Sequence, residues 1–197
     1  MSQIIESRFR VFEFDKNDVL LSDIADNGLP VHVNKAREEY DDSLQSKIGE
    51  LEPGHVIEAE IQSESVTRQD DIWKFLEIEV INETVFHFIE GADNYSYHVD
   101  ELIKKFDEMG EEAARTTISS GEEPIGFITV SEDKGDKFWR GLQSGLNTHE
   151  FDLKNLESIG EPPFEAIYTR TSNKELMIFY HFAQKGTKPA EAVLSTN

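Results

Sequence analysis

The chain has 197 residues, 40 acidic and 19 basic side chains, a formal net charge of -21, and no cysteine. The absence of cysteine excludes a disulfide scaffold, a cysteine nucleophile, an iron–sulfur cluster and a thiolate zinc site. Hydrophobic residues make up 38% of the chain and include 13 Phe, which is enough apolar material for one or two small cores and speaks against wholesale disorder.

The first half of the chain is predicted to begin with strands. Phe9 and Val11 alternate with Arg8, Arg10 and Phe12, which is the period of a half-buried strand. The short apolar runs Val19–Ile24 and Leu29–Val33 flank the turn residues Asp26–Gly28, a pattern that predicts a hairpin.

A short helix and further strands follow. Leu44, Ile48 and Leu51 have helical spacing, with a cap predicted at Asp42–Ser43. Strands are predicted at 55–61, 73–81 and 84–88. Five or six short strands interrupted by one helix favour a small Greek-key barrel, and an OB-like barrel is the simplest candidate for residues 1–90.

The rest of the chain is predicted to be mixed. Residues 91–120 contain a helical stripe and are assigned as a connecting helix, and the breaker cluster Ser119–Pro124 is a plausible domain boundary. Residues 121–197 are predicted to be an α+β unit with a hairpin formed by 164–170 and 175–182. The predicted fold class is therefore α+β, with the two parts either separate or packed as one body.

The chain resembles an uncharacterised family of acidic haloarchaeal proteins of about this length. The motifs that carry the resemblance are Arg8–Val11, Leu51–Gly54 and Thr84–Ala92. That family has no assigned activity, so the resemblance implies no catalytic residues. It implies a salt-adapted, cytoplasmic protein. The charge itself leaves two explanations open: a saline cytosol, or an acidic protein that binds a partner or mimics nucleic acid.

No sequence motif indicates an enzyme. The Walker, dinucleotide-binding, nucleophile-elbow and zinc-protease motifs are all missing, so we predict no catalytic residue, no metal ligand and no cofactor. The cluster Thr148–Asp152 has metal-ligand residue types but no helpful spacing. Four histidines could still form a site if at least two of them converge on an acid in a cleft: His87, His98, His149 and His181.

Two clusters are candidate binding surfaces. Arg8, Arg10 and Phe12 share one strand face and could form a stacking platform for single-stranded nucleic acid. The second cluster combines adjacent aromatic and basic residues, a composition typical of protein interfaces, and comprises Lys137, Phe138, Trp139 and Arg140.

These observations favour a non-enzymatic, acidic, cytoplasmic binding or adaptor protein whose partner is another protein. The alternatives are a hydrolase or nuclease with dispersed histidines and acids, and an OB-like protein that binds or mimics nucleic acid. The longest apolar runs, such as Met177–Tyr180, are far below the ~20 residues of a membrane span. We therefore expect no contact with a membrane, while the oligomeric state is left open.

Overall fold

The computed structural model describes residues 3–13, 17–24, 30–63, 73–93, 97–147 and 149–196. Their elements, in chain order, are β1 (Ile4–Glu13), β2 (Asp18–Asp23), β3 (Val31–Asn34), α1 (Asp42–Gly49), β4 (Val56–Ser63), β5 (Trp73–Asn82), β6 (Val85–Ala92), α2 (Tyr97–Met109), β7 (Ala113–Ser120), β8 (Glu123–Glu132), α3 (Asp136–Gln143), α4 (Glu150–Leu156), β9 (Glu165–Thr171), β10 (Leu176–Phe182) and α5 (Lys188–Thr196). The chain divides into two compact units. The first contains residues 1–83 and 138–148, and the second contains residues 84–137 and 149–197.

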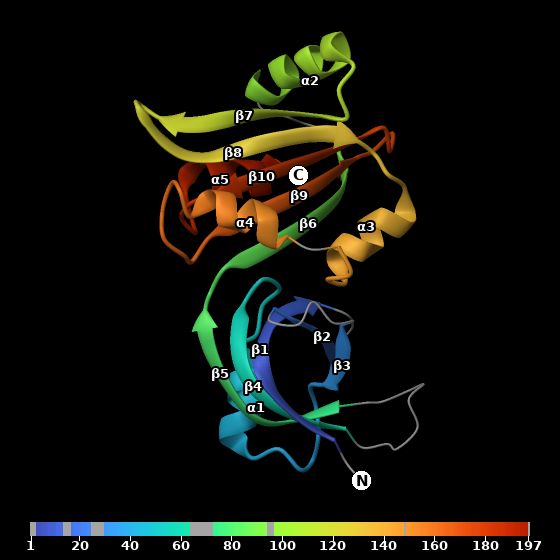
Figure 1. The fold of residues 1–197 in the computed structure, drawn as a ribbon, viewed down its shortest axis with the longest axis vertical. Helices are drawn as coiled ribbons and strands as arrows, with labels where there is room; N and C mark the ends of the chain where they lie inside the picture. The colour runs from blue at the N-terminus through green and yellow to red at the C-terminus, as the bar shows by residue number, and fades with distance from the viewer. Residues whose placement is uncertain are drawn as a thin grey trace. The chain divides into compact units, whose positions relative to one another are not determined.

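The first unit is a five-stranded sheet that closes into a ring (Figure 1). Its strand order is β1-β2-β3-β5-β4, and β4 pairs back onto β1. The β3–β5 pair is parallel and all other neighbours are antiparallel. The predicted α+β class is confirmed, and the strands predicted for the first 83 residues form this ring.

Alternate side chains along the strands point into the ring and fill its inside. Phe9 and Val11 of β1 face the same core as Val19 and Leu21 of β2, as the period of two requires. Strand β5 bends around this core through two irregularities in its pairing with β4. Each irregularity leaves one extra residue on β5, and these two residues, Leu76 and Ile81, are exposed hydrophobics of the ring.

Helix α1 lies between β3 and β4 in the sequence. Asp41 accepts a hydrogen bond from the amide of Leu44 (2.7 Å) and is the N-cap, one residue before the cap that the sequence predicted. Ile48 is buried in the ring core, and Lys47 Nζ donates to the carbonyl of Ile78 on β5 (3.1 Å). The helix is therefore attached to the ring by apolar packing of Ile48 and Leu44 and by the hydrogen bond of Lys47.

Residues 138–148 belong to the first unit although they are distant from it in sequence. Phe12 of β1 and its cross-strand partner Leu20 of β2 point away from the ring core, yet both are buried. The backbone of Gly145, with a φ of 73°, lies so close to Phe12 that a Cβ would meet its ring at 2.5 Å. The segment 138–148 therefore covers part of the outer face of β1.

The second unit is a five-stranded sheet with the order β6-β9-β10-β8-β7 (Figure 1). The β9–β10 hairpin appears where the sequence predicted it, and β6 runs parallel to β9. Side chains of α2 and α5 pack on one face of the sheet, in a core with Val130, Ile167 and Ile178.

The breaker cluster at 119–124 has a different role from the one expected. Gly121, with a φ of 66°, lies in the turn between β7 and β8, which pair along their whole length within one sheet. The segment predicted to be a connecting helix holds α2 and then β7. The first change of unit along the chain falls between Glu83 and Thr84, and the chain changes unit again after residues 137 and 148.

Candidate functional site

The second sheet has one face that is rich in aromatic and charged side chains. Because Ile167, Ile178 and Tyr180 face the core with α2 and α5, their strand neighbours Tyr168, Arg170 and His181 must face the other way. Helix α4 contacts β10. The elements thus bring two polar groups to this face, one around His181 and one around Arg170.

The first group, which we call the histidine cluster, comprises His149, Asp152, Tyr168 and His181. The ring of Tyr168 lies between the two imidazoles, with centroid distances of 4.6 Å to His149 and 5.6 Å to His181. His181 Nε2 lies 3.5 Å from Tyr168 Oη and 3.8 Å from Asp152 Oδ2. Phe127 stacks on His181 at 4.6 Å. Two histidines thus converge on one tyrosine, and an acid lies beside one of them.

The electrostatics of the cluster keep His181 neutral. Its side chain is buried, and loss of solvation, followed by repulsion from His149 and Arg115, lowers its pKa to about 3. Arg115 Nη2 in turn binds Asp152 Oδ1 at 2.5 Å, and its Cζ lies 4.2 Å from the Phe127 ring centroid. A neutral imidazole beside a carboxylate has the composition of a general base.

Access to the histidine cluster is closed. The relative exposures of His181, Tyr168 and His149 are 0%, 2% and 3%. A general base must come within hydrogen-bonding distance of a substrate proton, and these three groups cannot do so in this conformation. His149 and His181 thus contact the same tyrosine and Asp152 lies beside His181, while both imidazoles and the tyrosine ring are buried.

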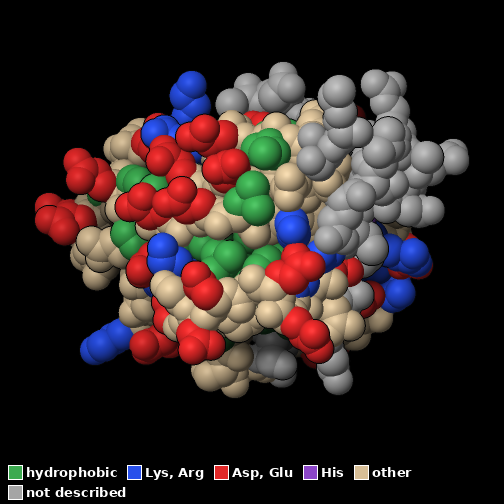
Figure 2. Space-filling model, turned by 90° about the horizontal axis from the view of Figure 1, so that it is seen from below, with side chains coloured by type: hydrophobic (Ala, Val, Ile, Leu, Met, Phe, Trp, Pro, Cys, Tyr) green, Lys and Arg blue, Asp and Glu red, His purple; other side chains and the backbone are tan. Residues whose placement is uncertain are grey.

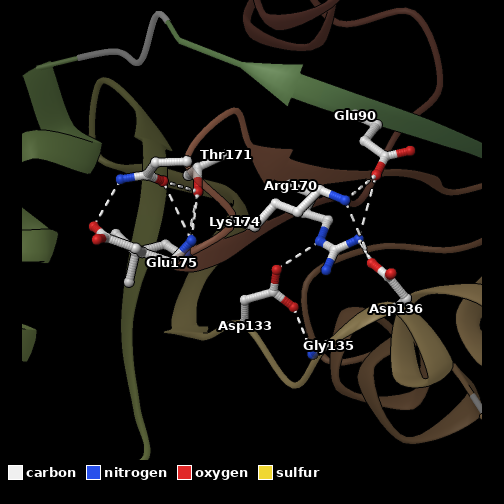
Figure 3. A network of polar contacts seen from close by, with 10 residues as sticks. Glu90, Asp133, Gly135, Asp136, Arg170, Thr171, Lys174 and Glu175 are labelled. Atoms are coloured by element: carbon white, nitrogen blue, oxygen red, sulfur yellow. Dashed lines mark hydrogen bonds and ion pairs between the residues drawn. The ribbon is translucent and has the colours of Figure 1, made fainter.

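The second group, which we call the Arg170 network, is built around one buried guanidinium (Figure 3). Arg170 donates to Asp133 (2.5 Å), Asp136 (2.7 Å) and Glu90 (3.2 Å). Asp133 also accepts the amide of Gly135 (2.7 Å). The side chains of Arg170 and Asp133 are 3% and 2% exposed, so this ion pair lies at the buried end of the network.

The charges within the network stabilise one another. The hydrogen bond with Asp133 raises the pKa of Arg170, despite the opposing effect of burial, and the bond with Asp136 adds to it. The hydrogen bond from Arg170, together with attraction to Lys174, lowers the pKa of Asp136. Lys174 Nζ lies 3.5 Å from Asp136 at the exposed side, and its backbone has a φ of 55° in the β9–β10 turn. The network joins the ends of β6, β8 and β9 to the start of α3.

A third polar pair lies on the opposite face of the sheet. His87 Nε2 is 3.0 Å from Glu165 Oε1, and the amide of Gly186 donates to Glu165 Oε2 (2.8 Å). Burial opposes ionisation of Glu165, but these two hydrogen bonds outweigh it and lower its pKa. His87 is half-buried and fixed by the carboxylate, as a strand-face histidine with one satisfied hydrogen bond would be.

The proposed interface residues do not form one exposed group. Trp139 is 2% exposed and Phe138 is half-buried, while Lys137 and Arg140 are exposed. A helix presents successive residues in different directions, and the side of α3 that carries Trp139 also buries Leu142. Trp139 therefore serves as a packing residue of the first unit and is not available as an interface anchor.

The proposed nucleic-acid platform is not open either. Arg8 is exposed and pairs with Glu58 (2.8 Å), but Arg10 is buried and donates to the carbonyl of Gly54 (2.7 Å). Phe12 is buried beneath Gly145. The three residues do share a strand face, as predicted, but two of them, Arg10 and Phe12, are covered by the chain itself.

The described part of the chain contains His, Asp and Glu side chains, but they are not grouped as metal ligands. Within the described ranges, no three His, Asp or Glu side chains gather in a way that could hold a metal ion. His149 and Asp152 of the Thr148–Asp152 motif both reach the histidine cluster, and Thr148 lies outside the described residues. Asp152 lies within the Thr148–Asp152 cluster noted from the sequence, whereas Tyr168 and Arg170 were not predicted, and their signal in the sequence is the alternation along β9.

Comparisons with known proteins add a family and nothing further. No curated protein and no solved structure matches the chain. A family model, described as a family of unknown function, matches residues 1–196, which is almost the entire chain. The chain therefore belongs to the family of unknown function DUF6663.

Proposed function

We propose that this protein is a non-enzymatic binding or adaptor protein of the cytoplasm, with another protein as its partner. The observation that carries the proposal is the enclosure of the groups that could perform chemistry. His149, Tyr168 and His181 are buried, and Arg170 is held by three carboxylates. Groups used in this way stabilise the sheet and are not presented to a substrate.

The first unit is proposed to be an OB-like barrel. The support is its strand order, the parallel β3–β5 pair and the position of α1 between β3 and β4. Binding of single-stranded nucleic acid is the second candidate function, because OB-like barrels often bind it on their outer strands. The burial of Arg10 and Phe12 counts against that function, since bases stack on exposed rings.

Mimicry of nucleic acid receives less support. A mimic needs carboxylates in a regular row that follows the spacing of phosphates. On the face shown in Figure 2, acidic side chains lie in separate groups with basic and hydrophobic side chains between them. Such a distribution suits a general excess of acid better than the imitation of one strand.

Affinity purification of the full-length protein from its native host tests the proposal. We expect one protein to co-purify in a constant ratio, and we expect nuclease treatment to leave that ratio unchanged. The His181→Phe variant should recover the same partner, because a buried histidine takes no part in binding. The proposal is contradicted if nucleic acid co-purifies and nuclease treatment removes it. It is also contradicted if the His181→Phe variant no longer recovers the partner.

We also propose that the acid excess is an adaptation to a saline cytosol. The support is the net charge of -21 on 197 residues. Repulsion among these charges destabilises the compact state, and it is screened when the Debye length falls to about 3 Å near 1 M salt. The midpoint of thermal unfolding should therefore be higher in 2 M KCl than in 0.1 M KCl. An equal or lower midpoint in 2 M KCl contradicts the adaptation.

A further inference from the structure

Strand β7 is one edge of the second sheet. Among the described residues it has a neighbouring strand on one side, β8, and it ends the strand order. Its other side carries a row of backbone amides and carbonyls that face no strand of the described part of the chain. Eight residues in extended conformation span roughly 27 Å, which is long enough to pair with a segment of another chain.

The sequence of β7 lacks the proline, lysine and acidic residues that often prevent such pairing, and its pairing with β8 is regular from Ala113 to Ile118, with an irregularity between Ile118 and Ser119. Residues 113–120 contain no proline, no lysine and no acid, in a chain where 40 of 197 residues are acidic. The single charged residue, Arg115, is occupied on the sheet face by Asp152, Thr129 and the Phe127 ring. Most of the other side chains are exposed or half-buried and small, including Thr116 and Thr117.

Acidic pairs stand at both ends of this edge. Glu111 and Glu112 precede β7, Glu122 and Glu123 follow it, and all four are exposed. Helix α2, which contacts β7 (Figure 1), contains four further acids, Asp100, Glu101, Asp107 and Glu108. Residues 97–123 together hold eight acidic and three basic residues, a net charge of -5.

We propose that β7 is the partner-binding surface, and that it accepts an extended segment of another protein with Lys or Arg at both ends as a sixth strand. This inference rests on the proposed binding function. Backbone hydrogen bonds to the edge supply the contact, and the flanking acids select a basic partner. A second copy of this chain fits poorly, since parallel or antiparallel pairing of two β7 strands places acids against acids at both ends.

A designed peptide tests the surface with the full-length protein. The probe is a fluorescein-labelled Lys-Lys-Thr-Val-Thr-Val-Thr-Val-Lys-Lys, titrated by anisotropy in 0.1 M KCl. We expect it to bind, and we expect two peptide controls to fail: one with Glu in place of Lys, and one with Pro in place of two central Val. Hydrogen exchange should slow at the amides of residues 113–118 when the peptide binds.

Charge variants of the protein provide the matched control. Neutralising the four flanking acids, Glu111, Glu112, Glu122 and Glu123, to Gln should weaken peptide binding about tenfold or more, since several exposed charge pairs are lost together. The comparison variant neutralises four exposed acids elsewhere to Gln, namely Glu77, Glu79, Glu161 and Glu191. It changes the net charge equally and should weaken binding much less.

The outcomes separate this inference from the binding function on which it rests. Three results each overturn the β7 surface. They are equal weakening of peptide binding by the two variants, unchanged hydrogen exchange at β7 when the peptide binds, and sedimentation of the free protein as a dimer. If the purified cellular partner still binds the flanking-acid variant with full affinity, the adaptor function stands and the β7 surface is wrong. If no partner exists but the peptide passes every control, the surface stands and the adaptor function is wrong.

Discussion

Replacing Arg170 with Met is expected to lower the free energy of unfolding by about 3–5 kcal/mol, because it leaves the buried carboxylate of Asp133 without its counter-charge. Met has a comparable length and fills most of the same space, so the loss is mainly electrostatic. Asp133 retains the amide of Gly135, which stabilises its charge in part. Urea unfolding at pH 7 measures the change.

Two further variants separate this cause from simple loss of packing. Lys174→Met removes a half-exposed cation from the same network and should cost at most about 1 kcal/mol. Adding Asp133→Asn to Arg170→Met removes the uncompensated charge and should recover part of the loss. A cost below about 1 kcal/mol for Arg170→Met, or no recovery in the double variant, contradicts this account of the network.

Acidification from pH 7 to pH 5 is expected to destabilise the fold through His181 by about 2 kcal/mol. The pKa of His181 is about 3 when folded, against about 6.5 when unfolded, so the unfolded chain binds the extra proton in this range. Stability is therefore lost as the pH falls below the unfolded pKa. The lowered pKa of Glu165 acts in the same direction, but below its ordinary value of 4.5.

A histidine variant isolates the source of this pH dependence. His181→Phe should fit between Phe127 and Tyr168 and should flatten the stability profile between pH 7 and pH 5. Identical slopes in the His181 variant and the unmodified protein would mean that the buried imidazole is not the group that titrates.

Much of the fold could be predicted from local sequence patterns. The features that could not be predicted depend on contacts between distant parts of the chain. Alternation at Phe9 and Val11 and in the β9–β10 hairpin predicts strands, because each has one face in a core. The Gly121 turn shows why breaker residues do not identify domain boundaries. A glycine with positive φ allows the chain to reverse its direction. Such reversals occur within a sheet as well as between domains, so the glycine does not distinguish the two.

The polar groups of the second sheet could not have been found in the same way. His149 and His181 are 32 positions apart in the chain. They meet because α4 packs over β10, a tertiary arrangement without a local signal. Trp139 presents the opposite problem: beside Arg140 it has the composition of an interface residue, and sequence cannot tell whether such a tryptophan is covered by its own chain.

The return of residues 138–148 to the first unit has a consequence for how the two units can be inherited or engineered. A gene fragment that ends at Glu83 encodes every strand of the ring but omits the cover over Phe12. A fragment that starts at Thr84 encodes that cover without the ring it belongs to. Neither unit is therefore a portable module, and recombination that exchanges one of them must move two separate stretches of coding sequence together.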